Sequence, residues 1–305
     1  MINFSKNHYY IYLSCRPWPV LCRISCMTTF TSIYLLLKTT SFYPLFISMI
    51  FLCLVSYQWW RDLRFEYLYD GFSSVTLESC LKNSILLFIS SEVLFFFSFF
   101  WSYFHYMFSD CMELGWHWSS LGITMFDYSN VPLLNTLILL RSGITITLSH
   151  HYYLNSFHRL SLFYLFLTLF IGMVFTFFQY IEYKSSFFCI NDSSFGRVFY
   201  LLTGFHGVHV FLGRIFIFIV SLRGTKFNLR QDSILRFDLC SWYWHFVDVV
   251  WLLLYFFVYY LSFLRFSIYS TTDFHSVRFD VNVTKFILLF IFIITIFLNL
   301  SVVLF

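Results

Sequence analysis

The chain has 305 residues, of which 59% are hydrophobic and only 11% are charged, and its mean hydropathy is +0.74. Soluble domains hold roughly 45–50% apolar and about 25% charged residues, so the composition excludes an ordinary soluble globular protein. The net charge of +4 comes from basic residues scattered over connecting segments, which does not indicate a nucleic-acid partner. The sequence predicts a polytopic membrane protein.

Long apolar runs follow one another along the whole chain. A helix needs about 20 largely apolar residues to cross a membrane, whereas membrane strands are short and alternate in polarity. The runs therefore predict an all-α fold, a transmembrane helical bundle with eight spans. The predicted spans are residues 19–37, 42–58, 83–106, 132–149, 160–182, 196–222, 237–263 and 284–305.

Polar segments divide the chain into four parts. Residues 1–60 hold two short spans, and the polar stretch 61–81 is expected to be a connector. Residues 82–263 hold five further spans, which we expect to pack as one bundle. Residues 264–305 form an extension with a polar beginning and an apolar end, which predicts the eighth helix.

Basic residues gather on one side of this eight-span arrangement, as they do on the inner side of membrane proteins. The richer side holds Lys6, Arg16, Arg61, Arg64, Lys82, Arg159, Arg223, Lys226, Arg230 and Arg236. Both termini are therefore predicted to lie on this side, which is the matrix if the protein is mitochondrial.

Alanine is absent from the sequence, although membrane helices usually pack through small residues. Serine and glycine are expected to take this role. The expected contact positions are Ser98, Ser102, Gly172, Gly204 and Gly207.

Glu92 lies in the middle of the predicted span 83–106, with no other charge for many residues after it. An ionisable side chain at the centre of a bilayer costs roughly 2.5–3.5 kcal/mol on insertion scales, so this carboxyl should face protein and stay neutral. It is either a neutral group hydrogen-bonded to a neighbouring helix or a functional, proton-related group.

Six further polar residues are expected to form a buried polar network: His150, His151, His206, His209, His245 and Asp248. His206 and His209 are three residues apart, so they share a helix face. The same holds for His245 and Asp248. A metal site would need a third ligand, which the sequence does not supply, and paired haem ligands lie several turns apart. Neither these histidines nor the eight cysteines are expected to bind a metal.

Trp59, Trp60, Phe88 and Arg223 lie where aromatic and cationic side chains meet lipid phosphates. They are either a phospholipid-binding site or part of a general belt of interfacial residues.

Several short segments carry the motifs of one known family in the right order. They are residues 17–19 (PWP), 58–62 (QWWRD), 87–96 (LFISSEVLFF), 99–101 (FFW), 131–136 (VPLLNT), 149–151 (SHH), 203–213 (TGFHGVHVFLG) and 242–251 (WYWHFVDVVW). Through them, residues 8 to 262 resemble subunit III of cytochrome c oxidase, the respiratory terminal oxidase of mitochondria and bacteria. The chain diverges from the family at Arg141 and Arg214, which fall inside spans and need partners, and in its added C-terminal span.

The resemblance implies seven helices, two of them set apart from the other five by a lipid-filled cleft, with the eighth helix as an addition. It implies a complex in the mitochondrial inner membrane with subunits I and II, which would hold haem a, haem a3 and copper, and with supernumerary subunits. That enzyme oxidises cytochrome c, reduces oxygen to water and moves protons. This chain would contribute no catalytic residue and no redox cofactor.

The resemblance also gives roles to single residues. Glu92 matches a buried carboxyl that reacts with carbodiimides and supports proton uptake by the catalytic subunit. Trp59, Trp60, Phe88 and Arg223 match positions that bind structural phospholipids. The chain would thus bind lipid, stabilise the catalytic subunit and support proton and oxygen delivery.

Three other readings stay open. Subunit III of a haem-copper quinol oxidase is a near relative that this chain alone discriminates poorly. A secondary transporter would explain the buried ionisable residues, but it predicts inverted repeats and broken helices, and the chain has only four prolines. A haem-carrying membrane oxidoreductase would explain the histidines, but their spacing opposes it.

Overall fold

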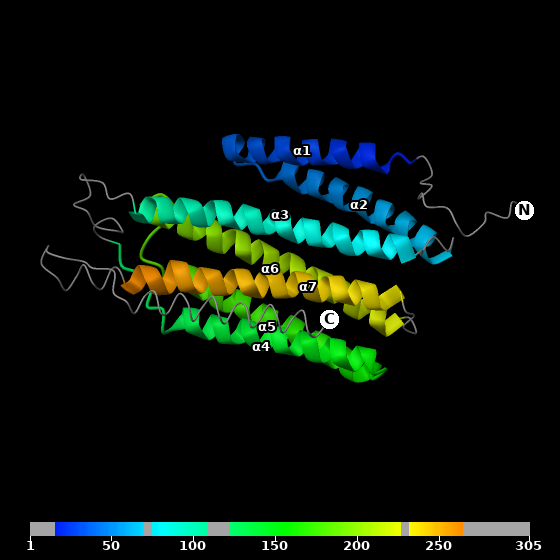
Figure 1. The fold of residues 1–305 in the computed structure, drawn as a ribbon. Coiled ribbons are helices and arrows are strands. Elements are labelled where there is room, and N and C mark those ends of the chain that lie inside the picture. The colour runs from blue at the N-terminus through cyan, green and yellow to red at the C-terminus, as the bar shows by residue number, and fades with distance from the viewer. Residues whose placement is uncertain (1–15, 70–74, 109–122, 227–231, 265–305) are drawn as a thin grey trace, which may run out of the picture. The chain divides into compact units, whose positions relative to one another are not determined.

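The computed structural model describes residues 16–69, 75–108, 123–226 and 232–264, and Figure 1 shows that these ranges are built from long helices. The helices are α1 (Trp18–Thr39), α2 (Tyr43–Tyr69), α3 (Val75–Phe108), α4 (Val131–Leu154), α5 (His158–Ser185), α6 (Ser194–Lys226), α7 (Asp232–Leu254) and η2 (Tyr255–Leu261), a π-helical continuation of α7. No strand occurs in these ranges, so the predicted all-α fold is confirmed.

Seven helical stretches in the described ranges are long and apolar enough to cross a membrane. They coincide with the first seven predicted spans, because the length of an apolar run reports the thickness it has to cross. The last of them runs without a break from Ile234 to Leu264, through α7 and η2. The predicted eighth span, 284–305, lies outside the described residues.

The chain divides into two compact units, Met1–Asn83 and Ser84–Phe305. Helix α2 continues to Tyr69 and α3 begins at Val75, so helix fills most of the predicted connector 61–81. The physical reason is that hydropathy marks where a helix leaves the hydrocarbon, whereas a polar helix can continue in water. The four-part division of the chain stays a prediction.

In the first unit, α1 and α2 pack through small hydroxyl side chains. The buried residues of α1 are Ser25, Thr29 and Ser32, and Ser32 Oγ lies 2.7 Å from Ser48 Oγ of α2. Small residues let two membrane helices approach closely, and a hydroxyl pair adds an interhelical hydrogen bond. At the other end of this antiparallel pair, Trp18 Nε1 donates to Asp62 Oδ2 at 2.7 Å.

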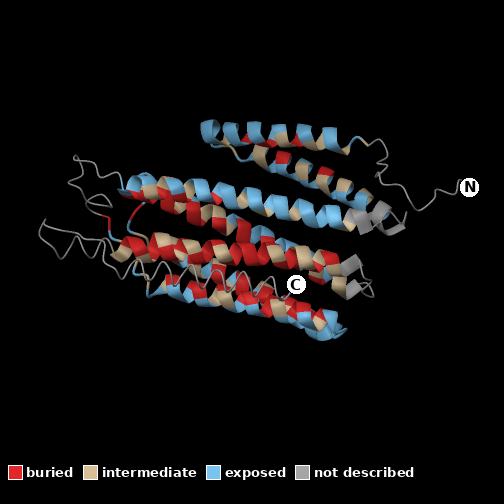
Figure 2. Cartoon of the chain, viewed as in Figure 1, coloured by how far each residue is buried: buried red, intermediate tan, exposed pale blue. Residues whose placement is uncertain are grey.

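In the second unit, α7 is the most buried helix, as the red ribbon in Figure 2 shows. It packs against α4 and α6, and α5 packs against the same two helices. Trp244 and Trp251 of α7 are completely buried, and Trp244 Nε1 donates to Ser142 Oγ of α4 at 3.0 Å. A helix that is apolar on all sides belongs in the interior, where a polar side chain on a neighbour can satisfy its indole.

A tyrosine of α3 holds the π-helical segment η2 by hydrogen bonds. A π turn leaves backbone carbonyls without their usual partners. Tyr103 OH donates to Phe257 O of η2 at 2.9 Å and also hydrogen-bonds to Ser262 Oγ. This buried tyrosine therefore joins the C-terminal part of α3 to the π-helical end of the last span.

Some of the glycines expected at helix contacts do make close contacts in the second unit. A Cβ at Gly172 of α5 would lie 3.2 Å from the Trp244 ring, so its predicted role is confirmed. Gly204 has nothing within 4 Å of such a Cβ and Ser98 is exposed, so these two predictions are wrong within this chain. Gly213, which the sequence analysis missed, would place a Cβ 2.9 Å from Trp244.

Replacement of Gly213 should therefore destabilise the bundle. Gly213→Ala forces a methyl group into the completely buried Trp244 ring, and overpacking of this kind costs about 1–3 kcal/mol. Gly204→Ala is the matched control on the same helix, because its methyl group meets open space and alanine favours the helix over glycine. Thermal unfolding in detergent should give a lower midpoint for Gly213→Ala and an unchanged or higher one for Gly204→Ala. Equal midpoints would contradict this packing.

Candidate functional site

The buried carboxyl predicted in the third span has a specific partner. Glu92 lies on α3, and its Oε2 is 3.0 Å from Nε2 of His209 on α6. The His209 side chain is 10% exposed, and that of Glu92 is 22% exposed. Glu92 is therefore only partly buried, whereas a buried carboxyl was expected. Its carboxyl lies at the edge of the bundle and contacts the more deeply buried imidazole of His209.

The hydrogen bonds of His209 determine how many protons this pair holds. His209 Nδ1 lies 2.7 Å from the carbonyl oxygen of Phe205, which can only accept, so Nδ1 carries a proton. The contact between Nε2 and Glu92 then requires one further proton. It lies either on the carboxyl, with a neutral imidazole, or on the imidazole, with a carboxylate. Both forms have the same total charge, so the pair is neutral as a whole.

Two aromatic rings pack against His209. The Phe96 ring centroid lies 5.1 Å from that of His209, and the Phe246 centroid lies 6.3 Å away. Rings exclude water from the imidazole, and an apolar surrounding strengthens a satisfied hydrogen bond and penalises a broken one. The geometry can hold and exchange a single proton between α3 and α6.

His245 and Asp248 form a second polar group, deep in α7. His245 Nδ1 lies 3.8 Å from Asp248 Oδ2, and Asp248 is 1% exposed. Both side chains point towards α4 at Gly143, where an added Cβ would lie 2.8 Å from Asp248 Oδ2. Gly143 thus provides the space that the carboxyl occupies.

The remaining histidines do not join these groups into one network. His206 Nε2 donates to Val247 O at 3.2 Å, and its ring packs against Phe175 and Trp251. His150 Nε2 lies 2.8 Å from Asp238 Oδ1 of α7. The predicted single network is thus a set of separate contacts between helices.

His151 is exposed, and its Nε2 lies 3.0 Å from Asn155 Nδ2, so its predicted burial is wrong. The cause is helix geometry. Successive residues are turned by about 100° around a helix axis, and here that turn carries His151 out of the buried face that holds Ser149 and His150.

Sequence reasoning missed three partners. Asp238, the partner of His150, lies at the start of the predicted span 237–263. Glu182 closes the predicted fifth span, yet it is 1% exposed and interacts with Tyr259. Arg214 is satisfied by Thr176, whose Oγ1 accepts from its Nη1 at 3.0 Å, and its guanidinium lies 5.7 Å from the Phe211 ring. The position of a carboxylate at the end of a predicted span was the only sequence signal that could have pointed to Asp238 and Glu182.

Known proteins resemble this chain over most of its length. The family described as cytochrome c oxidase subunit III matches residues 8–263. The chain belongs to the cytochrome c oxidase subunit III family. Cytochrome c oxidase subunit 3 of Drosophila yakuba is 41% identical over 254 residues, which are 83% of this chain and 97% of that protein. The proteins of the same name from Rhipicephalus sanguineus and Latimeria chalumnae are 40% and 37% identical, over 80% and 83% of this chain and 95% and 97% of their own lengths.

Membership in the cytochrome c oxidase subunit III family confirms the resemblance drawn from the motifs. The Glu92–His209 pair joins two of those motifs, residues 87–96 and 203–213. The Gly143 contact likewise joins α4 to the motif 242–251. The family match ends at residue 263, so the C-terminal extension lies beyond it.

The four predicted lipid-binding residues lie in both units. On α2, Trp59 is half-buried and Trp60 is 61% exposed. In the second unit, Phe88 stacks on Tyr243 with ring centroids 6.3 Å apart, and Arg223 is half-buried near the end of α6. A site shared by all four residues stays a prediction.

A metal site was not expected. Within the described ranges, no three His, Cys, Asp or Glu side chains lie close enough together to hold a metal ion. The wider expectation for the whole chain stays a prediction.

The hydrogen bond between Glu92 and His209 can be tested by two substitutions. Glu92→Gln keeps it, because the glutamine amide can donate to Nε2 of a neutral imidazole. Glu92→Leu leaves that nitrogen without its partner, which costs about 1–3 kcal/mol. Thermal unfolding should therefore separate the leucine variant from both wild type and the glutamine variant. Identical midpoints for the two variants would show that the bond does not stabilise the bundle.

Proposed function

We propose that this chain acts as the third subunit of a cytochrome c oxidase in the mitochondrial inner membrane. The complex oxidises cytochrome c, reduces oxygen to water and moves protons. Its haem a, haem a3 and copper belong to partner subunits I and II, and this chain takes part in the reaction without a catalytic residue of its own. The observation that carries the proposal is the continuous family match over residues 8–263.

The contribution of this chain is support of the catalytic subunit. Apolar side chains remain exposed on most of the helices, as the pale blue residues of Figure 2 indicate for α1 to α3. Such surfaces suit contact with lipid or with other subunits. Glu92 and His209 supply a neutral, proton-holding pair at the edge of the bundle, which fits a supporting role in proton delivery better than a redox role.

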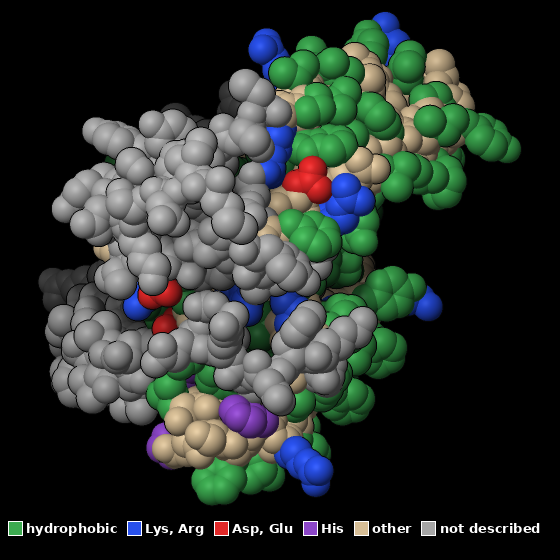
Figure 3. Space-filling view, turned by 90° about the vertical axis from the view of Figure 1, so that its right-hand side faces the viewer, with side chains coloured by type: hydrophobic (Ala, Val, Ile, Leu, Met, Phe, Trp, Pro, Cys, Tyr) green, Lys and Arg blue, Asp and Glu red, His purple; other side chains and the backbone are tan. Residues whose placement is uncertain are grey.

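The distribution of charge supports the proposed orientation. In the second unit, Arg159, Arg223 and Arg236 lie at the end where α5 and α7 begin and α6 ends. Figure 3 looks onto the end of the second unit at which α5 and α7 begin, where lysine and arginine side chains lie among hydrophobic ones. We assign this end to the matrix by the excess of basic residues. The N-terminus then lies on the matrix side, and the C-terminus returns there if the predicted eighth span crosses.

Purification of the native complex tests the proposal. A tag on this chain should recover two further core subunits, one with a copper-binding domain, together with haem a and copper in the complex. The isolated chain should hold neither haem nor stoichiometric metal. A complex that contains no copper-binding subunit would favour the quinol oxidase relative, and recovery of the chain without any haem protein would contradict the proposal.

Arg223 tests the lipid-binding part of the proposed role. Arg223→Ala should lower the phospholipid content of the purified oxidase and shorten its active lifetime, because a cation at a span end holds lipid phosphate. The initial rate should change little, since no redox centre is touched. Arg197→Ala, at the opposite end of the same helix, is the control. Unchanged lipid content and lifetime would reduce Arg223 to a general interfacial residue.

A further inference from the structure

Arg23 is a cation on the exposed side of α1, inside a membrane span. It follows Trp18, the first residue of the helix, by five positions, and the opposite side of α1 is buried against α2. Arg61 of the same unit is paired with Asp62 at 3.1 Å. Arg23 has no hydrogen-bond or ion-pair partner within the part of the chain that the structure describes. A charge in this position needs a partner from outside these residues.

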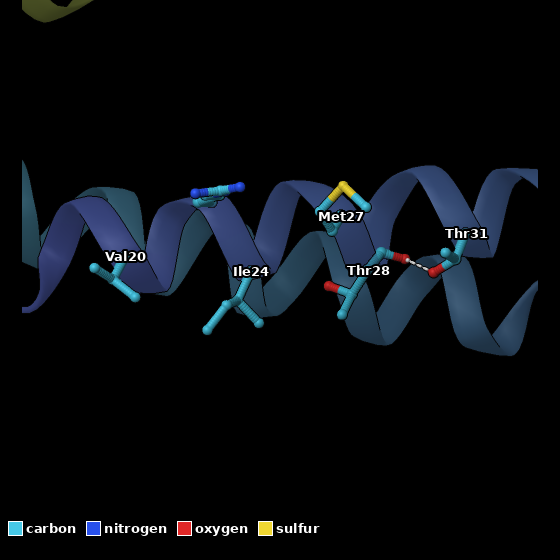
Figure 4. A pocket seen from close by; sticks show the side chains of 6 residues that line it. Val20, Ile24, Met27, Thr28 and Thr31 are labelled. Carbon is cyan, nitrogen blue, oxygen red and sulfur yellow. Dashed lines mark hydrogen bonds between the residues drawn. The ribbon is translucent and has the colours of Figure 1, made fainter.

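A shallow groove runs along this side of α1, as Figure 4 shows. Its lining consists of Val20, Arg23, Ile24, Met27, Thr28 and Thr31. The hydroxyls of both threonines are already used, because Thr28 Oγ1 donates to Ser25 O at 2.9 Å and Thr31 Oγ1 donates to Thr28 O at 3.0 Å. The groove is therefore apolar except for a single cation near its N-terminal end.

The dimensions of the groove match one leaflet of a membrane. Val20 and Thr31 are separated by eleven positions, which correspond to about 16 Å along a helix axis. Half of the hydrocarbon core of a bilayer is about 15 Å thick. The groove thus has the length of one extended acyl chain.

The position of Arg23 suits a phosphate at the membrane surface. Side chains on a helix lean towards its N-terminus, so the Arg23 guanidinium can reach back towards the level of Trp18. The indole of Trp18, hydrogen-bonded to Asp62, lies at the polar boundary of this unit. A long arginine side chain can keep its stem in the apolar groove and its guanidinium at that boundary.

We propose that this groove binds one anionic phospholipid, with its phosphate at Arg23 and one acyl chain along Val20, Ile24, Met27 and Thr31. The site lies entirely on α1 and shares no residue with the lipid site proposed around Arg223. The apolar stripe accepts the chain without regard to the headgroup, so selectivity comes from the charge. An anionic headgroup gains about 1 kcal/mol from one nearby arginine, equivalent to about fivefold in affinity.

Photolabelling of the whole complex tests the site. The purified oxidase is reconstituted into phosphatidylcholine vesicles that contain phosphatidylglycerol with a photoactivatable acyl chain. Label on residues 20–31 is then measured by mass spectrometry. Arg23→Gln should lower this label about fivefold, whereas Arg23→Lys should keep most of it. Lys38→Gln, near the other end of α1, is the matched control and should leave the label unchanged. A phosphatidylcholine probe with the same acyl chain should label these residues more weakly than phosphatidylglycerol does in wild type, Arg23→Lys and Lys38→Gln, and as strongly as phosphatidylglycerol does in Arg23→Gln.

The experiment also needs an arm that does not depend on assembly of a variant. In the wild-type complex, unlabelled phosphatidylglycerol should compete for the label on residues 20–31 more effectively than added phosphatidylcholine. Equal competition by the two lipids, or equal labelling of wild type and Arg23→Gln, would overturn the proposal. Cross-links from these residues to another protein chain, with no lipid label, would show a subunit interface and would also overturn it. Label near Arg223 is scored on a separate peptide, so the two sites can fail independently.

Discussion

Polar side chains within hydrocarbon must find their partners inside protein, and this constraint determines how the second unit is arranged. Glu92 and His209 tie α3 to α6, and His150 and Asp238 tie α4 to α7. Each contact joins helices that are distant in sequence, so a change of helix register would leave a polar group alone in an apolar medium. That penalty of several kcal/mol per group exceeds the small net gain of an ordinary hydrogen bond. The polar pairs therefore specify the arrangement more than they stabilise it.

Helix α7 is central because a larger share of its residues is buried than in any other described span. Its two buried tryptophans need neighbours on all sides. Trp244 requires an acceptor for its indole, which Ser142 supplies, and it requires space, which Gly172 and Gly213 leave free. The outward surfaces of the other helices are mostly apolar. This division between a specific interior and an apolar exterior fits a subunit that offers surfaces to lipid and to partner subunits and performs no redox chemistry itself.

The sequence predicted the first seven spans and singled out the unusual polar residues within them, because apolar length and the cost of buried charge are local properties. It could not predict which helix each polar residue meets. Glu92 was recognised as unusual, but its partner lies 117 residues away, and nothing in the residues around either one reveals the distance between them. His151 was misplaced because a motif of two adjacent histidines says nothing about the rotation of the helix. Gly213 was missed because the size of the ring opposite a glycine depends on packing.

Helix α7 lies in a protein interior, while the outer faces of α1, α5 and α6 are mostly apolar and accessible. A carbene reagent dissolved in the bilayer labels side chains according to their contact with lipid, and it can be applied to the assembled complex. We expect Trp244 and Trp251 to stay unlabelled, along with their neighbours on α7, while exposed side chains such as Phe30, Phe170 and Phe218 take up label. Labelling of α7 as heavily as these helices would contradict this arrangement.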